Sequence, residues 1–145
     1  FSAALVCAGG YGVRVESARK VVSAQTWIQY AANAAAGAAT GDAARAVYAA
    51  FVSLKPMPDG SCYYSTGMQA MNLPDAAAPA DLSAQKASEV LATFLVHCFE
   101  HAKELKDGQS FRPPQAQHFT MELRDCAHFP PGHPQHNPHG VWHLR

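Results

Sequence analysis

The chain has 145 residues, which is enough for one domain with its own hydrophobic core. Lysine plus arginine equals aspartate plus glutamate at 11 each, and only 15% of the residues are charged. Binding to nucleic-acid phosphates needs a basic excess on one face, so this composition argues against a nucleic-acid partner. Weakly charged, alanine-rich flanks favour instead a subunit whose sides are covered by neighbouring proteins.

Residues 1–13 carry no charge, and 1–14 are predicted to form an apolar N-terminal arm or a short membrane-associated helix. Because the chain starts with Phe1 rather than Met, we expect either a removed leader or a start inside a longer protein. Small residues recur every fourth position at Ala4, Ala8 and Gly12, the spacing that lets helices approach closely in a membrane. The apolar run is shorter than the roughly 20 residues that a membrane span needs.

The first 20 residues, FSAALVCAGGYGVRVESARK, resemble the membrane segment of the small dimer-forming subunit e of mitochondrial ATP synthase. The resemblance lies in the small-residue repeat, in Tyr11-Gly12 and in the following Arg14. It implies a class, a small subunit of an organellar membrane complex, and it does not extend to the rest of the chain.

Two helices are predicted next, over 15–37 and 42–54, as an antiparallel pair joined by a short connection. No charged side chain occurs from Val21 to Gly41. That length would cross a bilayer, but alanine and the interspersed polar residues make insertion marginal, which favours an interior or interface helix. Pro56 ends the second helix and opens a long linker, 56–80, in which 61–66 is a candidate short strand.

The segment 81–108 carries the clearest helix pattern. Asp81 or Ser83 is suited to cap its first turn, and Gly108 to close it. The fold class predicted is mainly α, with a small three-helix core over 15–107. The stripe of this helix expected to face that core comprises Ala87, Val90, Leu91, Phe94, Cys98, His101 and Leu105.

The C-terminal tail, 108–145, is predicted to be extended, because six of the ten prolines and six of the eight histidines lie within it. Its one strand signal is the alternation over 118–124. That strand needs a mate, either 61–66 or the sheet of another protein. The residues expected to bind a partner are Phe119, Met121 and Leu123 on the strand and Trp142 as an anchor.

Two groups of residues carry metal-binding chemistry. His97-x-x-Glu100-His101 resembles the inverzincin motif of pitrilysin-type proteases, in which two histidines bind zinc and the glutamate is the general base. No third ligand is evident, and the chain is far shorter than that family's catalytic unit. The second group is Cys126-x-His128 with the later histidines of the tail, whose spacing matches no known zinc finger.

The prediction for function is a non-enzymatic accessory or structural subunit, without a cofactor, that binds other protein subunits through both arms. A mitochondrial or other organellar membrane complex is the favoured setting. One alternative is a secreted helical domain with two disulfides, since four cysteines permit three pairings or four free thiols. The other alternative is a zinc-dependent hydrolase.

Overall fold

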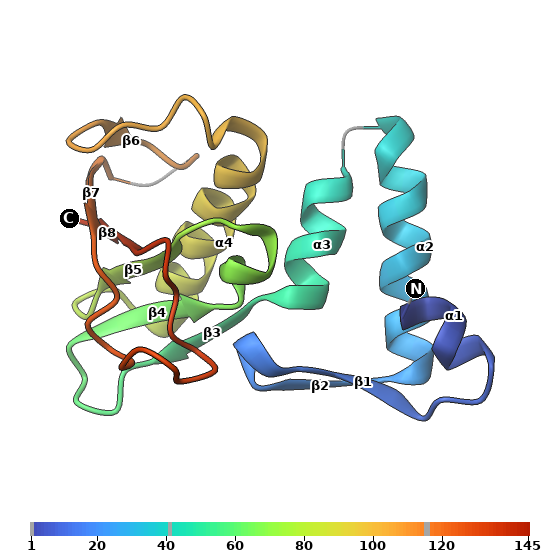
Figure 1. Cartoon of the computed structure of the whole chain (residues 1–145). Coiled ribbons are helices and arrows are strands. Elements are labelled where there is room, and N and C mark those ends of the chain that lie inside the picture. The colour runs from blue at the N-terminus through green and yellow to red at the C-terminus, as the bar shows by residue number, and fades with distance from the viewer. Residues whose placement is uncertain (1, 41, 115–116) are drawn as a thin grey trace.

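The computed structural model describes residues 2–40, 42–114 and 117–145, and they form two lobes (Figure 1). The N-terminal lobe contains α1 Ser2–Cys7, β1 Gly12–Val15, a 3-10 turn Glu16–Ala18, β2 Lys20–Ser23, α2 Ala24–Thr40 and α3 Ala43–Phe51. The C-terminal lobe contains β3 Ser53–Pro56, β4 Cys62–Thr66, a 3-10 turn Met68–Met71, β5 Asp75–Pro79, α4 Ala84–His101, β6 Ser110–Phe111, β7 Phe119–Arg124 and β8 Val141–Leu144.

The prediction of a mainly α fold is wrong, because the C-terminal lobe is built on a six-stranded sheet with the order β3-β4-β5-β8-β7-β6. The described chain is 39% helix and 25% strand. Every neighbouring pair is antiparallel except β5 and β8, which run parallel with Ala76 opposite Trp142. The predicted strand 118–124 therefore has mates within its own chain, with β8 on one side and β6 on the other.

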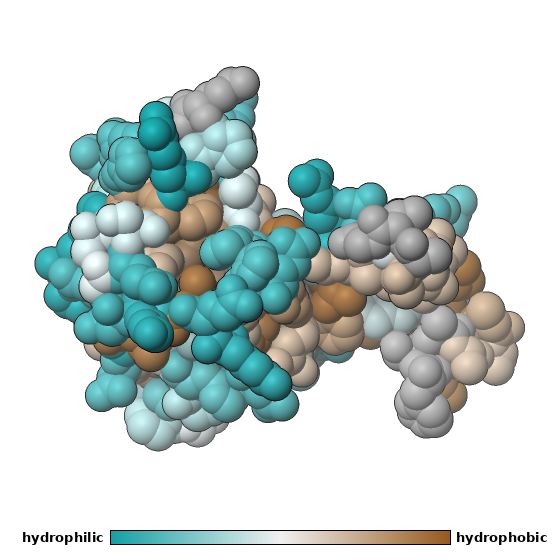
Figure 2. All heavy atoms as spheres, turned by 90° about the horizontal axis from the view of Figure 1, so that it is seen from above, coloured by the Kyte–Doolittle hydropathy of each residue, from teal (hydrophilic) through white to brown (hydrophobic). Residues whose placement is uncertain are grey.

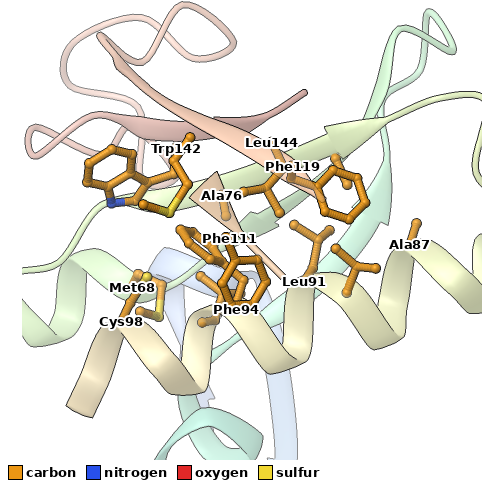
Figure 3. Packing of buried hydrophobic residues seen from close by; sticks show 14 of the residues in the cluster. Met68, Ala76, Ala87, Leu91, Phe94, Cys98, Phe111, Phe119, Trp142 and Leu144 are labelled. Atoms are coloured by element: carbon orange, nitrogen blue, oxygen red, sulfur yellow. The ribbon is translucent and has the colours of Figure 1, made fainter. Parts of the chain in front are cut away.

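Helix α4 covers one face of this sheet (Figure 3). Phe94 is fully buried and stacks edge-on against Phe111, with ring centroids 4.9 Å apart. The predicted helix and most of its apolar stripe are confirmed. Its C-terminal part is not, because α4 ends at His101, whose side chain is 41% exposed rather than central to the core.

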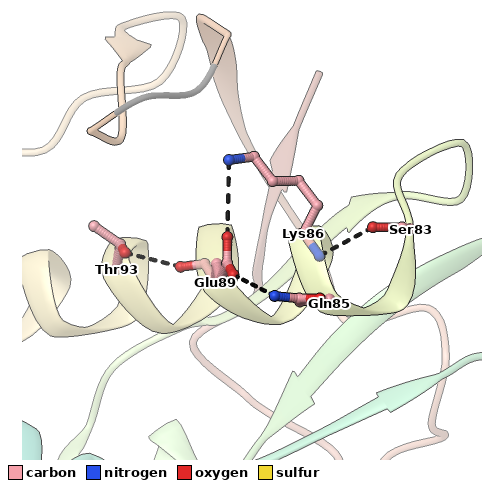
Figure 4. A network of polar contacts seen from close by, with 5 residues as sticks. All are labelled: Ser83, Gln85, Lys86, Glu89 and Thr93. Atoms are coloured by element: carbon pink, nitrogen blue, oxygen red, sulfur yellow. Dashed lines mark hydrogen bonds and ion pairs between the residues drawn. The ribbon is translucent and has the colours of Figure 1, made fainter.

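The sequence around the start of α4 explains why the helix begins there (Figure 4). The Ser83 hydroxyl accepts a hydrogen bond from the Lys86 amide at 3.2 Å, which satisfies one of the free donors of the first turn. On the solvent face, Glu89 accepts from Gln85 at 3.1 Å and lies 3.8 Å from the Lys86 ammonium. These exposed i,i+3 and i,i+4 pairs add a few tenths of a kcal/mol each, about 0.2–0.5.

The other face of the sheet is covered by the segment 125–140, so the tail is not an extended arm. A buried polar network attaches it, in which Asn137 donates to Asp75 at 2.7 Å and to the Leu73 carbonyl at 2.9 Å. Next to that network is an apolar cluster of Tyr64, Ala77 and Val141 with Met57, Cys62, Cys126 and Phe129. Proline is tolerated here because this segment lies outside the strand ladder.

The helix predicted over 15–37 is wrong in its first third, where β1 and β2 form a hairpin with Val13 opposite Val22. β-branched residues at alternate positions bury Val15 and Val22 against Trp27 of α2. The predicted antiparallel pair of helices is confirmed for α2 and α3 (Figure 1). Gly37 does not end the first helix but allows α3 to approach, since a Cβ there would lie 2.7 Å from the Ala43 nitrogen.

The membrane helix considered for the N-terminal residues is absent from the structure that is described. Residues 1–20, which resemble a membrane helix in sequence, include the six-residue helix α1 and most of the hairpin. Among the described residues, every helix is too short or too polar to span a bilayer. The mitochondrial setting, which was inferred from the apolar N-terminal segment and the non-Met start, receives no evidence from this fold.

Candidate functional site

A cavity of about 770 Å³ forms an interlobe cleft between α3, α4 and the segment after β6. Ligand pockets commonly have this size. Its apolar floor comes from α4 and β6, and its polar groups come from all three segments. The lining residues are Asp42, Arg45, Tyr48, Ala92, Thr93, Val96, His97, Glu100, Ser110, Phe111, Arg112 and Pro114.

His97 is the histidine that enters this cleft. Its ring is half-buried and lies 4.5 Å from the His101 ring and 5.7 Å from the Phe111 ring, between centroids. Burial, followed by the neighbouring His101, lowers the pKa of His97 below its usual value. The imidazole is therefore mainly neutral near pH 7 and able to accept or donate one hydrogen bond.

The opposite wall of the interlobe cleft carries a hydroxyl and two guanidinium groups. Burial raises the pKa of Tyr48 to about 12, so its hydroxyl remains a donor. Arg45 and Arg112 are exposed, and neither takes part in an ion pair within the residues that the structure describes. Asp42 and Glu100 balance their charge, so the rim has no clear preference for anions or cations.

The arrangement of His97, Glu100 and His101 differs from a zinc-hydrolase centre. His101 lies 4.0 Å from the Glu100 carboxylate and 3.4 Å from the Glu104 carboxylate, at the exposed end of α4 and in the turn that follows it. Over residues 2–40, 42–114 and 117–145, no group of three or more His, Cys, Asp or Glu is placed to hold a metal ion. The structure thus supplies no third ligand for the motif.

The predicted group Cys126 and His128 is rearranged as well. The sulfur nearest His128 is that of Cys62, 4.0 Å from its Nε2. His133 stacks on Phe129 with ring centroids 4.9 Å apart, and the His136 ring bonds the Phe129 carbonyl at 2.8 Å. Those two histidines therefore hold the segment 125–140 in shape. All four cysteines are free thiols, with Cys98 buried under α4 and Cys7 exposed on α1.

The residues predicted to bind a partner from the tail have different surroundings. Phe119, Met121 and Trp142 are 1%, 2% and 5% exposed and belong to the core beneath α4. Only Leu123 of that set is at the surface, with 43% exposure. The strand predicted over 118–124 is present as β7, but it joins the sheet of its own chain and its apolar side chains pack there.

An exposed apolar surface lies on the N-terminal lobe. Its members are Leu5 at 56% exposure, Tyr11 at 99%, Val21 at 77% and Ile28 at 40%, and we call these four the N-lobe surface. They are four of the five large hydrophobic side chains recorded as exposed in the described chain. In Figure 2, brown and tan atoms gather over the N-terminal lobe, whereas hydrophilic atoms cover much of the C-terminal lobe.

Backbone groups accompany these side chains. β1 and β2 form a sheet of two strands, so each has an outer edge that pairs with no strand of the described chain. On α2, the exposed Gln29 donates to Asn33 at 2.8 Å, which adds uncharged polar groups beside Ile28.

Comparison of the chain with protein-family models, curated proteins and solved structures finds no match.

Proposed function

We propose that this chain is a non-enzymatic accessory or structural subunit of a protein assembly, and that the N-lobe surface contacts the neighbouring subunit. The observation that carries the proposal is the concentration of exposed apolar side chains on one lobe, led by Tyr11 and Val21. Exposed apolar side chains gathered in one region of a protein surface mark interaction sites, and these four lie on or beside elements that pack together, α1, the β1–β2 hairpin and α2.

The energy available from covering this surface supports the proposal. Burial of a valine, leucine or isoleucine side chain contributes about 1.5–3 kcal/mol relative to full exposure. Val21 is almost fully exposed, so a partner has most of that amount to gain there. Association also loses translational and side-chain freedom, which means that several such residues must act together.

The occupant is a protein rather than a lipid surface. The hairpin offers unpaired backbone donors and acceptors along its edges, which an added strand satisfies but hydrocarbon does not. Exposed amides such as Gln29 and Asn33 fit a protein interface for the same reason. No charged residue occurs between Val21 and Gly41, and the exposed Arg14 opposite Val21 is paired with Glu16, so the expected partner face is mainly apolar with a charged margin.

The proposal is tested by native mass measurement of the tagged protein in gently lysed source cells, with Val21→Asp and Tyr11→Asp. Leu123→Asp is the matched control, because it places the same charge on the one exposed large hydrophobic of the C-terminal lobe. We expect the wild type and the control to migrate in one defined complex and the two N-lobe variants to leave it. A photoreactive residue at position 21 should cross-link to a protein of that complex.

Two results would overturn the proposal. One is a wild-type protein that migrates as a lone monomer in the lysate. The other is binding of the purified protein to anionic phospholipid vesicles that Val21→Asp abolishes, with no protein complex found. A complex made of a second copy of this chain would keep the proposal and identify the neighbour.

A further inference from the structure

Three side chains with metal-binding chemistry converge on the sheet face opposite α4. Cys62 comes from β4, His143 from β8 and His128 from the segment that covers this face. The register explains the meeting, since Tyr64 pairs with Ala77 and Ala77 pairs with His143, which places all three on one face. Cys62 lies two residues before Tyr64 and so shares that face.

The Cys62 sulfur and one His128 ring nitrogen lie at a separation that two ligands of a single metal ion can have. Cys62 Sγ and His128 Nε2 are 4.0 Å apart, and the His128 and His143 ring centroids are 6.2 Å apart. A zinc-sized ion lies about 2.3 Å from a thiolate and about 2.1 Å from an imidazole, so two such ligands of one ion are about 3.6 Å apart at a tetrahedral angle and about 4.4 Å apart in a line. The observed separation corresponds to an angle wider than tetrahedral.

We propose that Cys62 and His128 form a two-ligand binding site for a soft monovalent metal ion, Cu⁺. Thiolate is a soft ligand that suits Cu⁺, and a Cu⁺ ion is satisfied by two ligands, here the sulfur of Cys62 and the imidazole of His128. Structural zinc requires four ligands, and the described residues contain no group of three placed for a metal ion.

The surroundings of the pair suit a bound cation. A cavity of about 440 Å³ is lined by Cys62 and His143, so it reaches the residue whose sulfur would bind the ion. The Met57 amide donates to the Cys62 carbonyl at 2.8 Å and fixes the backbone that carries the sulfur. The ring of Tyr64 lies 6.1 Å from that of His128 and limits how the imidazole turns. On binding, the Cys62 thiol releases its proton to solvent, so affinity rises with pH.

The test is an anaerobic competition in which purified protein withdraws Cu⁺ from a chromogenic chelator. We expect the wild type to bind a single ion per chain, and Cys62→Ser and His128→Asn each to weaken binding more than about tenfold. Cys126→Ser is the matched control, because that half-buried thiol packs against the same apolar cluster and should leave affinity unchanged. Circular dichroism confirms that each variant is folded.

X-ray absorption of the loaded wild type gives an independent readout, and sulfur and nitrogen together in the first shell are expected. If Cys62→Ser does not fold, this spectrum and the His128→Asn titration decide. The proposal fails if wild-type protein withdraws no Cu⁺, if Cys62→Ser binds like the wild type, or if the first shell lacks nitrogen. It also fails if Zn²⁺ displaces Cu⁺ at equal concentration.

Discussion

Asp75 sets a pH dependence of stability that can be predicted from its surroundings. Its side chain is 3% exposed, and it accepts hydrogen bonds from the Ser65 hydroxyl at 3.1 Å, the Met68 amide at 3.2 Å and Asn137 at 2.7 Å. Those donors favour the charged form, but burial is the larger effect and raises the pKa of Asp75 from 3.8 to about 6. The folded state therefore binds the proton more tightly than the unfolded chain.

The size of the effect follows from proton linkage. A difference of about 2 between the folded and unfolded pKa values corresponds to about 3 kcal/mol in the free energy of unfolding. Because the folded pKa is the higher one, this contribution is fully present below pH 3.8 and is lost as the pH rises through about 6. A rise from pH 4 to pH 7 should thus lower the free energy of unfolding through the titration of Asp75 alone.

The assay compares urea unfolding of the wild type and Asp75→Asn at several pH values across this window. In Asp75→Asn one carboxylate oxygen becomes an amide NH₂, which then faces a donor, either Asn137 or the pair Ser65 and Met68, so the variant carries a pH-independent loss of stability. Other titrating groups cancel in the difference between the two proteins, which isolates the slope due to Asp75. Parallel stability curves from pH 4 to pH 7 would refute the reasoning.

The other two predictions concern packing and backbone. Phe94→Ala should lower the free energy of unfolding, measured in urea, by about 3–5 kcal/mol, because Phe94 is fully buried between Phe111 and Trp142. The surface change Leu123→Ala should alter it by no more than about 0.5 kcal/mol. Equal losses in the two variants would contradict the assigned core. Gly67→Ala should lower the free energy of unfolding by at least about 2–3 kcal/mol, since Gly67 has a φ of +118° and a Cβ there would collide with the Phe51 carbonyl. Gly60→Ala, at a φ of +71° with open space around the Cβ, should lower it by about 1 kcal/mol. Similar melting temperatures for the two variants would show that the turn at Gly67 relaxes freely.

Sequence reasoning found the elements whose residues report their own surroundings. The stripe of α4 and its Ser83 cap appear as helix spacing, and β4 and β7 appear as short strand patterns. It missed β5, whose residues Ala76, Ala77 and Ala78 are all nearly inaccessible. Small side chains are required there because α4 covers one face and the segment 125–140 the other, yet an alanine run has no β preference.

The hairpin β1–β2 was missed for a different reason. Its valines fit a helix stripe as well as a strand, and residues 15–37 as a whole read as one helix. Only the burial of Val15 and Val22 against Trp27 selects the hairpin, and that contact is tertiary. The N-lobe surface was not predicted for the same reason, because the hairpin geometry, and not a helix face, exposes Tyr11 and Val21.

The histidines of the tail show why sequence spacing alone did not bring Cys62 and His128 together. In sequence, His128 is next but one to Cys126, and proline separates the later histidines. In the fold, the parallel pairing of β5 with β8 returns the chain end to the middle of the sheet, and the buried Asn137 ties the intervening segment down. The sulfur that meets His128 then belongs to Cys62, 66 positions away. Local spacing detects ligands only when one turn or helix carries them, whereas this pair exists only once the sheet has formed.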